Sequence, residues 1–275
     1  MEQQFTSLTV DGQGVAWLWL DKPQVHNAFD DRLIAELNGH LERLHRQASS
    51  AQVRALVLGS QGKHFSAGAD LGWMRRMVGY DFTDNLADSQ ELARLMGLLD
   101  SMPCPVIGRV QGAAFGGAVG LAACCDVVVA SEHAKFCLSE VKIGLSPAVI
   151  SPYVQVAIGV QQMRRYALTG EVIDSTRALA LGLAHEVVEH DQLDQEVQTI
   201  LEALHLGSPQ AQRRTKALLA TVQLENDPDR RRDYTCQVIS ELRVSDEGQE
   251  GLASFFDRRP AKWVETPQDS AMEQG

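Results

Sequence analysis

The 275-residue sequence lacks several features that define common protein classes. It has no continuous apolar run of the about 18 to 20 residues that a membrane-spanning helix needs, so we expect no membrane association. Positive charge is scarce, because 25 Lys and Arg stand against 36 Asp and Glu, for a formal net charge of −11. Since an acidic surface repels phosphate backbones, we expect no nucleic-acid partner.

Motifs for metal binding and for an activated nucleophile are also missing. The five cysteines include no Cys-x-x-Cys pair, and Cys124 and Cys125 are adjacent, which suits neither zinc nor a mutual disulfide. We interpret them as reduced, mostly buried thiols of a cytoplasmic protein, and residues 1–4 do not begin a secretory signal. There is no His-Glu-x-x-His and no Gly-x-Ser-x-Gly, so neither a metal site nor a hydrolase triad is expected.

Strand and helix patterns alternate over the first 190 residues. Apolar runs at 5–10 and 15–20 flank a Gly-rich turn and predict a hairpin, and Asn27 or Asp30 can cap the helix that follows. Further strands are predicted at 53–58, 106–110, 126–130, 134–138 and 185–188, and further helices at 117–125, 151–168 and 175–181. This alternation favours an α/β fold with functional loops at the C-terminal ends of the strands.

Only helical patterns follow residue 191, and they are broken at 207–209 and 226–228. We therefore divide the chain into a core, residues 1–205, and a helical region, residues 206–275.

The densest unusual feature is the glycine-rich segment 111–120 (QGAAFGGAVG), between a predicted strand and a predicted helix. Backbone N–H groups at such a helix start can hold a phosphate or an oxyanion. Ala118 and Val119 replace the Lys-Ser/Thr of a P-loop, which excludes a nucleoside triphosphatase. The alternative is structural, namely close packing of a helix on a strand through small residues.

Two further segments carry candidate chemistry. The loop 63–70 (KHFSAGAD) also joins a strand to a helix, and Asp70 can cap that helix. Two loops of this kind can direct two N–H groups at one atom. Glu140 stands among apolar residues in 136–147 (FCLSEVKIGLSP), where desolvation favours its neutral form and suits proton transfer. Taken alone, a glutamate in such a segment is more often a surface or ion-paired residue than a catalytic one.

Together these segments resemble the enoyl-CoA hydratase/isomerase family, the crotonases. The similarity covers nearly the whole chain, through 23–28 (PQVHNA), 65–70 (FSAGAD), 112–126, 139–144 (SEVKIG) and 250–256 (EGLASFF). The resemblance implies an α/β spiral of ββα units, a C-terminal helical trimerisation region, and a homo-oligomer that is a trimer or a dimer of trimers. It implies an acyl-CoA substrate and no cofactor, since coenzyme A is part of that substrate.

The resemblance also assigns roles to individual positions. Ala69 and Gly117 match the two backbone donors of the family's oxyanion hole, and Glu140 matches the second of its two catalytic glutamates. Positions matching those that hold or flank coenzyme A are Val25, Ala67, Asp70, Leu71 and Phe255. Phe255 belongs to a tail that, in the family, supports the coenzyme A pocket of a neighbouring subunit.

The first family glutamate would fall at position 120, where this chain has Gly120. Around it, 115–121 and 136–140 are similar to the bacterial methylglutaconyl-CoA and isohexenylglutaconyl-CoA hydratases. Both substrates carry a second carboxylate, and we expect a glycine at 120 to remove a repulsive charge and to open space. Asn85 and Asp88, on the helix expected after Ala69, are candidates for a second contact to water.

The sequence thus predicts a hydratase of a branched 2-enoyl-CoA thioester, 3-methylglutaconyl-CoA or isohexenylglutaconyl-CoA. One alternative is a Δ3,Δ2-enoyl-CoA isomerase, in which Glu140 moves a proton and no water is needed. Another is a crotonase-fold protein that binds acyl-CoA without turnover.

Overall fold

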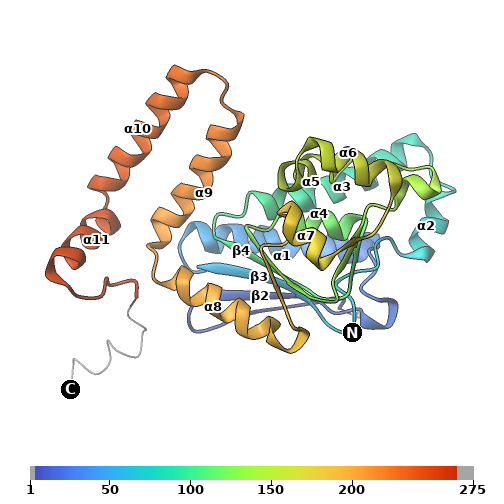
Figure 1. Ribbon diagram of the computed structural model, residues 1–275, viewed down its shortest axis with the longest axis horizontal. Coiled ribbons are helices and arrows are strands. Elements are labelled where there is room, and N and C mark those ends of the chain that lie inside the picture. The colour runs from blue at the N-terminus through green and yellow to red at the C-terminus, as the bar shows by residue number, and fades with distance from the viewer. Residues whose placement is uncertain (1–3, 265–275) are drawn as a thin grey trace.

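The core is built on a six-stranded sheet in the order β1-β2-β3-β4-β6-β9, within a computed structural model that describes residues 4–264 (Figure 1). β1 (Thr6–Val10) and β2 (Val15–Leu20) form the predicted antiparallel hairpin. The remaining neighbours in this sheet all pair in parallel. They are β3 (Ala55–Ser60), β4 (Val106–Val110), β6 (Val127–Ser131) and β9 (Glu186–Val188).

A second, three-stranded sheet lies beyond the C-terminal ends of these strands, in the order β5-β7-β8. Its members are β5 (Ala113–Phe115), β7 (Lys135–Cys137) and β8 (Ile173–Asp174). β4 leads directly to β5, and β6 leads directly to β7, so successive turns of the chain supply one strand to each sheet. The loop after β3 joins the same layer through an isolated parallel bridge between Ser66 and Ala114. This confirms the predicted α/β spiral of ββα units.

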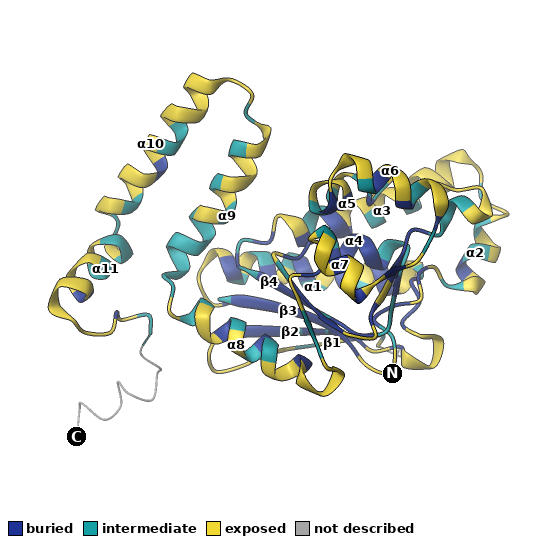
Figure 2. Ribbon diagram, in the orientation of Figure 1, coloured by how far each residue is buried: buried dark blue, intermediate teal, exposed yellow. Residues whose placement is uncertain are grey.

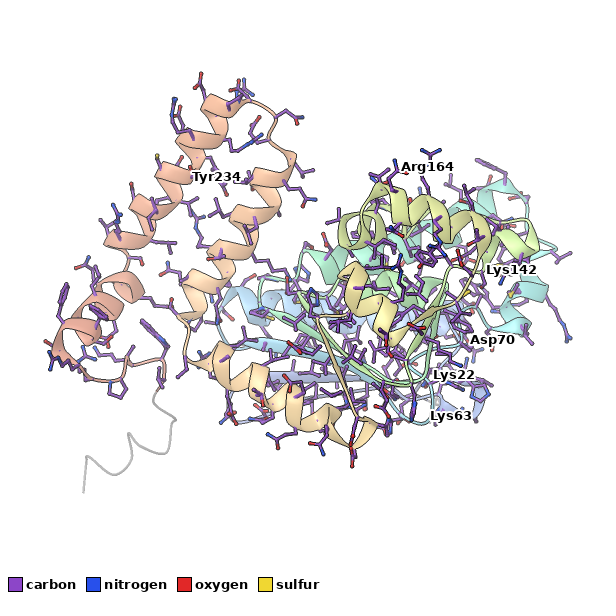
Figure 3. All side chains as sticks on the ribbon, viewed as in Figure 1. Lys22, Lys63, Asp70, Lys142, Arg164 and Tyr234 are labelled. Atoms are coloured by element: carbon purple, nitrogen blue, oxygen red, sulfur yellow. The ribbon has the colours of Figure 1, made fainter. Side chains whose placement is uncertain are left out.

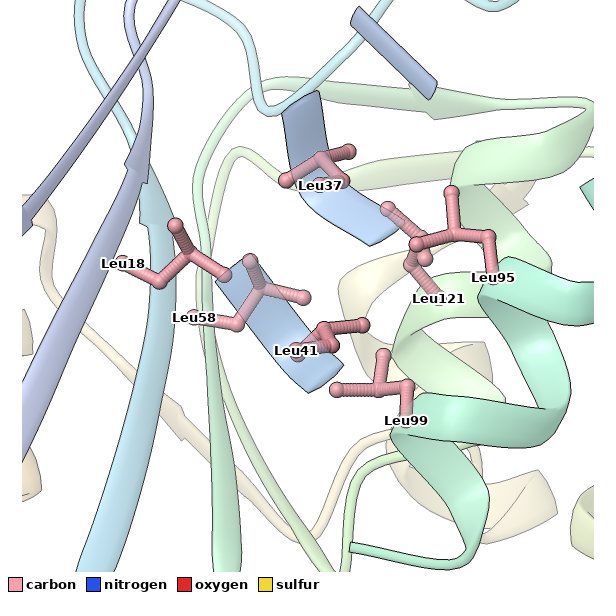
Figure 4. A pocket seen from close by; sticks show the side chains of 7 residues that line it. All are labelled: Leu18, Leu37, Leu41, Leu58, Leu95, Leu99 and Leu121. Carbon is pink, nitrogen blue, oxygen red and sulfur yellow. The ribbon is translucent and has the colours of Figure 1, made fainter. Parts of the chain in front are cut away.

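Helices cover both faces of the large sheet (Figure 1). Seven leucines from β2, β3, α1, α3 and α4 meet on one face, with a space between them too small for a water molecule (Figure 4). On the other face Leu193, Val197 and Leu201 of α8 pack on the strands. Because both faces are covered, the parallel strands are apolar on both sides. The helices are α1 (Asp31–Ser49), α2 (Leu71–Met77), α3 (Phe82–Asp100), α4 (Gly117–Ala123), α5 (Ser151–Ile158), α6 (Val160–Thr169), α7 (Ser175–Leu181) and α8 (Leu193–His205).

After α8 the chain leaves the core as a helical arm (Figures 1 and 2), formed by α9 (Pro209–Leu224), α10 (Pro228–Val244) and α11 (Asp246–Asp257). The chain then returns to the start of the arm. Arg54 ties the two ends together, since its guanidinium donates to the carbonyls of Trp263 (2.9 Å), His205 (3.1 Å) and Gly207 (3.1 Å). These three helices lie within the region 206–275, of which residues 265–275 lie outside the described residues.

Several elements differ from the sequence prediction. β5 and β8 were not predicted, and the strand expected at 53–58 is β3, shifted by two residues. Gly159 divides the helical stretch at 151–168 into α5 and α6. Asn85 and Asp88 lie on α3 rather than on the helix after Ala69, because a turn at 78–81 separates α2 from α3. Within residues 4–264 no helix has the length and apolar character that crossing a bilayer requires.

Candidate active site

The two glycine-containing loops are held against each other by main-chain hydrogen bonds. The Ser66 N–H donates to the Ala113 carbonyl (2.9 Å), and the Phe115 N–H donates to the Ser66 carbonyl (3.1 Å). Gly68 has a φ of +92°, and a β-carbon there would lie 3.2 Å from the Phe115 oxygen. Glycine is needed at 68 because the loops approach this closely in a left-handed backbone conformation. The pairing places the start of α2 beside the start of α4.

Ala69 and Gly117 present free N–H groups on either side of Phe29. The residues on either side of Ala69 are hydrogen-bonded to Phe29: the Gly68 carbonyl accepts from the Phe29 N–H (2.8 Å), and the Asp70 N–H donates to the Phe29 carbonyl (2.7 Å). The Ala69 N–H itself has no acceptor within residues 4–264. Gly117 is the first residue of α4, and its N–H likewise has no acceptor in the described chain. A β-carbon at Gly117 would lie 3.7 Å from the Phe29 ring, and Phe29 pairs with Ala69. Two unpaired donors in one place can bind an oxyanion.

Glu140 lies beside this pair of donors. It opens the 3₁₀ helix η2 (Glu140–Ile143), and a β-carbon on Gly116 would lie 3.4 Å from its Oε1. The Oε2 atom is buried and has no hydrogen-bond partner among the described residues. Burial raises the pKa of the Glu140 carboxyl above its ordinary value. Such a carboxyl holds a proton nearer neutrality than an exposed one and is suited to acid–base catalysis.

Position 120 does not provide the open space that we expected. A β-carbon on Gly120 would lie 2.3 Å from Ile150 Cγ2 and 3.1 Å from Met96 Sδ. Ile150 and Met96 are both buried. The expectation of added room was therefore wrong, because side chains from α3 and from the start of α5 fill the volume that a residue at 120 would occupy. The expectation that this position carries no charge is unaffected.

Four of the five residues predicted to hold or flank coenzyme A, namely Val25, Ala67, Asp70 and Leu71, lie around the start of α2. Val25 and Leu71 are exposed, and the Ala67 carbonyl and Leu71 N–H have no partner within residues 4–264. Asp70 is engaged as the cap of α2, where its Oδ1 accepts from the N–H groups of Gly72 (2.8 Å) and Trp73 (3.1 Å). Figure 3 shows Asp70, Lys22 and Lys63 at the end of the core remote from Tyr234 of the arm. Val25, Ala67 and Leu71 can therefore contact a ligand, whereas Asp70 has a structural role as the cap of α2.

Phe255 is not brought to this site within one chain. It lies on α11, 76% exposed, with its ring 5.6 Å from that of the equally exposed Phe256. Figure 1 places α11 on the far side of the arm from α2. Its predicted contact with coenzyme A therefore requires a second subunit.

Two residues that organise the site were missed by sequence reasoning. Asn27 is fully buried, and its side chain joins three segments through the Lys22 N–H (2.8 Å), the Gln61 carbonyl (2.8 Å) and the His64 carbonyl (2.9 Å). The predicted alternative that Asn27 caps α1 is wrong, since Asp30 does so. His64 accepts from the Ala113 N–H (3.0 Å) through Nδ1 and so fixes the start of β5. The hydrogen bonds of Asn27 and His64 join segments distant in the sequence, so the neighbouring residues give no local signal for either role.

The chain belongs to the enoyl-CoA hydratase/isomerase family, whose model matches residues 11–266. An enoyl-CoA hydratase structure from Shewanella pealeana is 47% identical, with a TM-score of 0.90 over 95% of this chain and 97% of that one. Pseudomonas aeruginosa AtuE is 32% identical, with a TM-score of 0.91 over 95% of this chain and 100% of that one. The crotonyl-CoA hydratase of Syntrophomonas wolfei is 27% identical over 251 residues, 91% of this chain and 94% of that protein. These likenesses confirm the crotonase fold.

Proposed function

We propose that this protein is a hydratase of a branched 2-enoyl-CoA, either 3-methylglutaconyl-CoA or isohexenylglutaconyl-CoA. The observation that carries the proposal is the meeting of two unpaired N–H groups, at Ala69 and Gly117, with the buried, unpartnered carboxyl of Glu140. Membership of the family and the likeness to enoyl-CoA hydratases support the general activity.

The arrangement suits addition of water to a conjugated thioester. The thioester oxygen accepts hydrogen bonds from Ala69 and Gly117, and these bonds strengthen as the oxygen gains charge in the enolate. One such donor typically contributes about 10² to 10³ in turnover. Glu140 exchanges a proton with the α-carbon, a role for which a raised pKa keeps the carboxyl protonated at higher pH.

The choice of a substrate with a second carboxylate rests on charge. Position 120 has no side chain, and its neighbours Ile150 and Met96 are apolar, so no fixed negative charge stands there. A dicarboxylyl substrate therefore avoids a like-charge contact that a second glutamate would create. The similarity of segments 115–121 and 136–140 to the two named classes of hydratase supports the same choice.

The test is to incubate the purified protein separately with 3-methylglutaconyl-CoA, isohexenylglutaconyl-CoA and crotonyl-CoA and to follow product mass. Hydration of either branched substrate in preference to crotonyl-CoA adds one water and supports the proposal. A Δ3,Δ2-enoyl-CoA isomerase shifts the double bond without a change in mass. An acyl-CoA-binding protein without activity leaves all three substrates intact.

We also propose that the protein is a cytoplasmic homo-oligomer, a trimer or a dimer of trimers, that needs no cofactor beyond the coenzyme A of its substrate. The exposed apolar side chains of the arm, among them Phe255 and Phe256, support association between subunits. Sedimentation equilibrium of the intact protein tests the subunit number.

A further inference from the structure

Lys22 is a buried lysine whose charge has no part in the proposed reaction. It lies between β2 and the 3₁₀ helix η1 (Pro23–Val25), and 7% of the residue is exposed. Asn27 fixes its backbone, since the Lys22 N–H donates to Asn27 Oδ1 (2.8 Å) and the Asn27 N–H donates to the Lys22 carbonyl (2.9 Å). The Nζ atom lies 4.6 Å from the centre of the Phe5 ring. Because taking an ammonium group out of water is costly, a lysine buried to this degree requires anionic partners.

Two carboxylates meet this ammonium group. Lys22 Nζ donates to Asp30 Oδ2 at 2.6 Å and lies 4.0 Å from Asp70 Oδ2. Each carboxylate uses its other oxygen as a helix cap: Asp30 Oδ1 accepts from the Leu33 N–H (2.9 Å), and Asp70 Oδ1 accepts from two N–H groups at the start of α2. Burial raises the pKa of Asp30, but the Lys22 ammonium and the Leu33 N–H outweigh burial and hold that pKa below its ordinary value. One ammonium group therefore joins the starts of α1 and α2.

The two helix starts flank the main-chain pairing that orients the Ala69 N–H. Phe29 pairs with Ala69 in an isolated parallel bridge, and each of the two is followed directly by one of the aspartates. The bridge consists of the bond from the Phe29 N–H to the Gly68 carbonyl (2.8 Å) and the bond from the Asp70 N–H to the Phe29 carbonyl (2.7 Å). The direction of the Ala69 N–H thus depends on how closely the starts of α1 and α2 are held. Without the ammonium group, the carboxylates of Asp30 and Asp70 would repel each other at this point.

We propose that Lys22 is a positioning residue, which holds the starts of α1 and α2 together so that the Ala69 N–H points at the thioester oxygen. This inference rests on the proposed function, in which Ala69 is one of two oxyanion donors. Lys22 acts through Asp30 and Asp70 and does not touch the reacting atoms. Loss of its charge misaligns a hydrogen bond that strengthens as the enolate forms, so kcat falls more than substrate binding weakens.

The first measurement observes the hydrogen bond to the thioester oxygen without any turnover. Butyryl-CoA labelled with ¹³C at the thioester carbonyl is bound to the protein, and infrared difference spectroscopy records the carbonyl stretching band. Hydrogen bonds to a carbonyl oxygen lower this frequency, so the parent should lower it relative to butyryl-CoA in buffer. Lys22→Met keeps the length of the side chain without its charge, and its band should move back toward the frequency in buffer. Lys22→Arg keeps the charge and should give the parent's band.

The second measurement is the hydration of the best substrate of the panel. Lys22→Met should lose about 10- to 10²-fold in kcat, the usual effect of a displaced catalytic group, with KM within about threefold of the parent. Lys22→Arg should restore most of the lost kcat. The matched control is Lys63→Met, because Lys63 is exposed and belongs to the same loop as Ala69. This control removes a positive charge near the site and should keep both the kcat and the carbonyl band of the parent.

A double-mutant cycle tests whether Lys22 acts through Asp70. Asp70→Asn keeps an oxygen that can cap α2 and leaves the pair of Lys22 with Asp30, and should shift the carbonyl band in the same direction as Lys22→Met. If the two residues act together, the variant with both substitutions loses no more kcat than Lys22→Met alone. A loss equal to the product of the two single losses would show independent action and would overturn the inference.

The carbonyl band decides between positioning and a merely structural role. A band that stays at the parent's frequency in both Lys22→Met and Asp70→Asn would overturn the inference, whatever happens to stability. A parent that shifts the band but hydrates no substrate would overturn the proposed function alone, and the band of Lys22→Met would still test the role of Lys22. A parent that leaves the band unshifted would overturn the assignment of the oxyanion donors and this inference with it.

Discussion

Gly120 and Ile150 exclude any side chain at the position where the family's first catalytic glutamate would stand. A β-carbon on Gly120 would lie 2.3 Å from Cγ2 and 2.8 Å from Cβ of Ile150, both far inside van der Waals contact. Ile150 is the residue that precedes the first turn of α5, so the packing of α4 against the start of α5 leaves no room for a side chain at position 120. Ile150 therefore fills the volume that a glutamate at position 120 would need, and a single substitution at 120 cannot restore that glutamate.

Gly120→Ala is expected to lower the free energy of unfolding by about 1 to 3 kcal/mol, the usual cost of overpacking a core. Chemical denaturation measures the change. Gly39→Ala is the control, because Gly39 lies within α1 with nothing near its β-carbon, and removing an internal helical glycine stabilises by about 0.5 to 1 kcal/mol. Equal effects of the two substitutions would show that Ile150 does not fill position 120. Gly120→Glu should not fold stably and should not restore a second carboxylate to the site.

Gly117→Pro tests the second oxyanion donor. Proline is tolerated at the first position of a helix, where Gly117 lies, but it has no N–H to donate. We expect turnover to fall by at least about 10² to 10³. Gly117→Ala keeps the N–H and adds a methyl group at ordinary contact distance from Phe29, so it should lose less. Steady-state kinetics on both folded variants measure their turnover. Near-normal turnover by Gly117→Pro would exclude Gly117 as a donor to the thioester oxygen.

The raised pKa of Glu140 has a consequence for stability. The folded protein holds a proton on Glu140 between the carboxyl's ordinary pKa of 4.5 and its higher folded value, whereas the unfolded chain has released it. The free energy of unfolding therefore falls as pH rises through this window. Glu140→Gln removes that dependence, so the variant should gain stability relative to the parent at neutral pH and not below pH 4. Thermal unfolding of both proteins across this range measures the difference, and a constant difference would contradict the raised pKa.

The aromatic pair of the arm tests the link between assembly and substrate binding. Replacing Phe255 and Phe256 together with Ser should weaken the oligomer and raise KM for a coenzyme A substrate, with little effect on kcat of the remaining assembled enzyme. Phe82→Ser is the control, because Phe82 is also exposed but lies on α3 of the core. Analytical ultracentrifugation and kinetics on the same samples give the result. A dissociated variant with unchanged KM would show that assembly through the arm does not contribute to binding of the coenzyme A substrate.

Much of the fold was predictable because its signals are local. Alternating apolar runs defined the hairpin and the parallel strands, and the motif around Ala69 and the glycine-rich segment before Gly117 indicated two N–H donors at helix starts. The short strands β5 and β8 were missed, since three and two residues carry too little periodicity to be distinguished from loops. The turn that separates α2 from α3 was missed for a similar reason.

The contacts that complete the site are long-range and have no such signal. Nothing near Gly120 in the sequence shows that Ile150, thirty residues later, fills its volume. The three hydrogen bonds of Asn27 likewise depend on residues up to 37 positions away in the chain. Residue types therefore indicated the chemistry, and the tertiary packing determines which residues perform it.

The most direct test is the rate at which Glu140→Gln exchanges the α-protons of butyryl-CoA and hydrates the best enoyl-CoA in a single turnover. Glutamine keeps the shape of the side chain but cannot exchange a proton, so both rates should fall by about 10² to 10⁴ while the variant still binds acyl-CoA. Rates within tenfold of the parent would mean that another group moves the proton at the α-carbon, and the assignment of this site to Glu140 would be wrong.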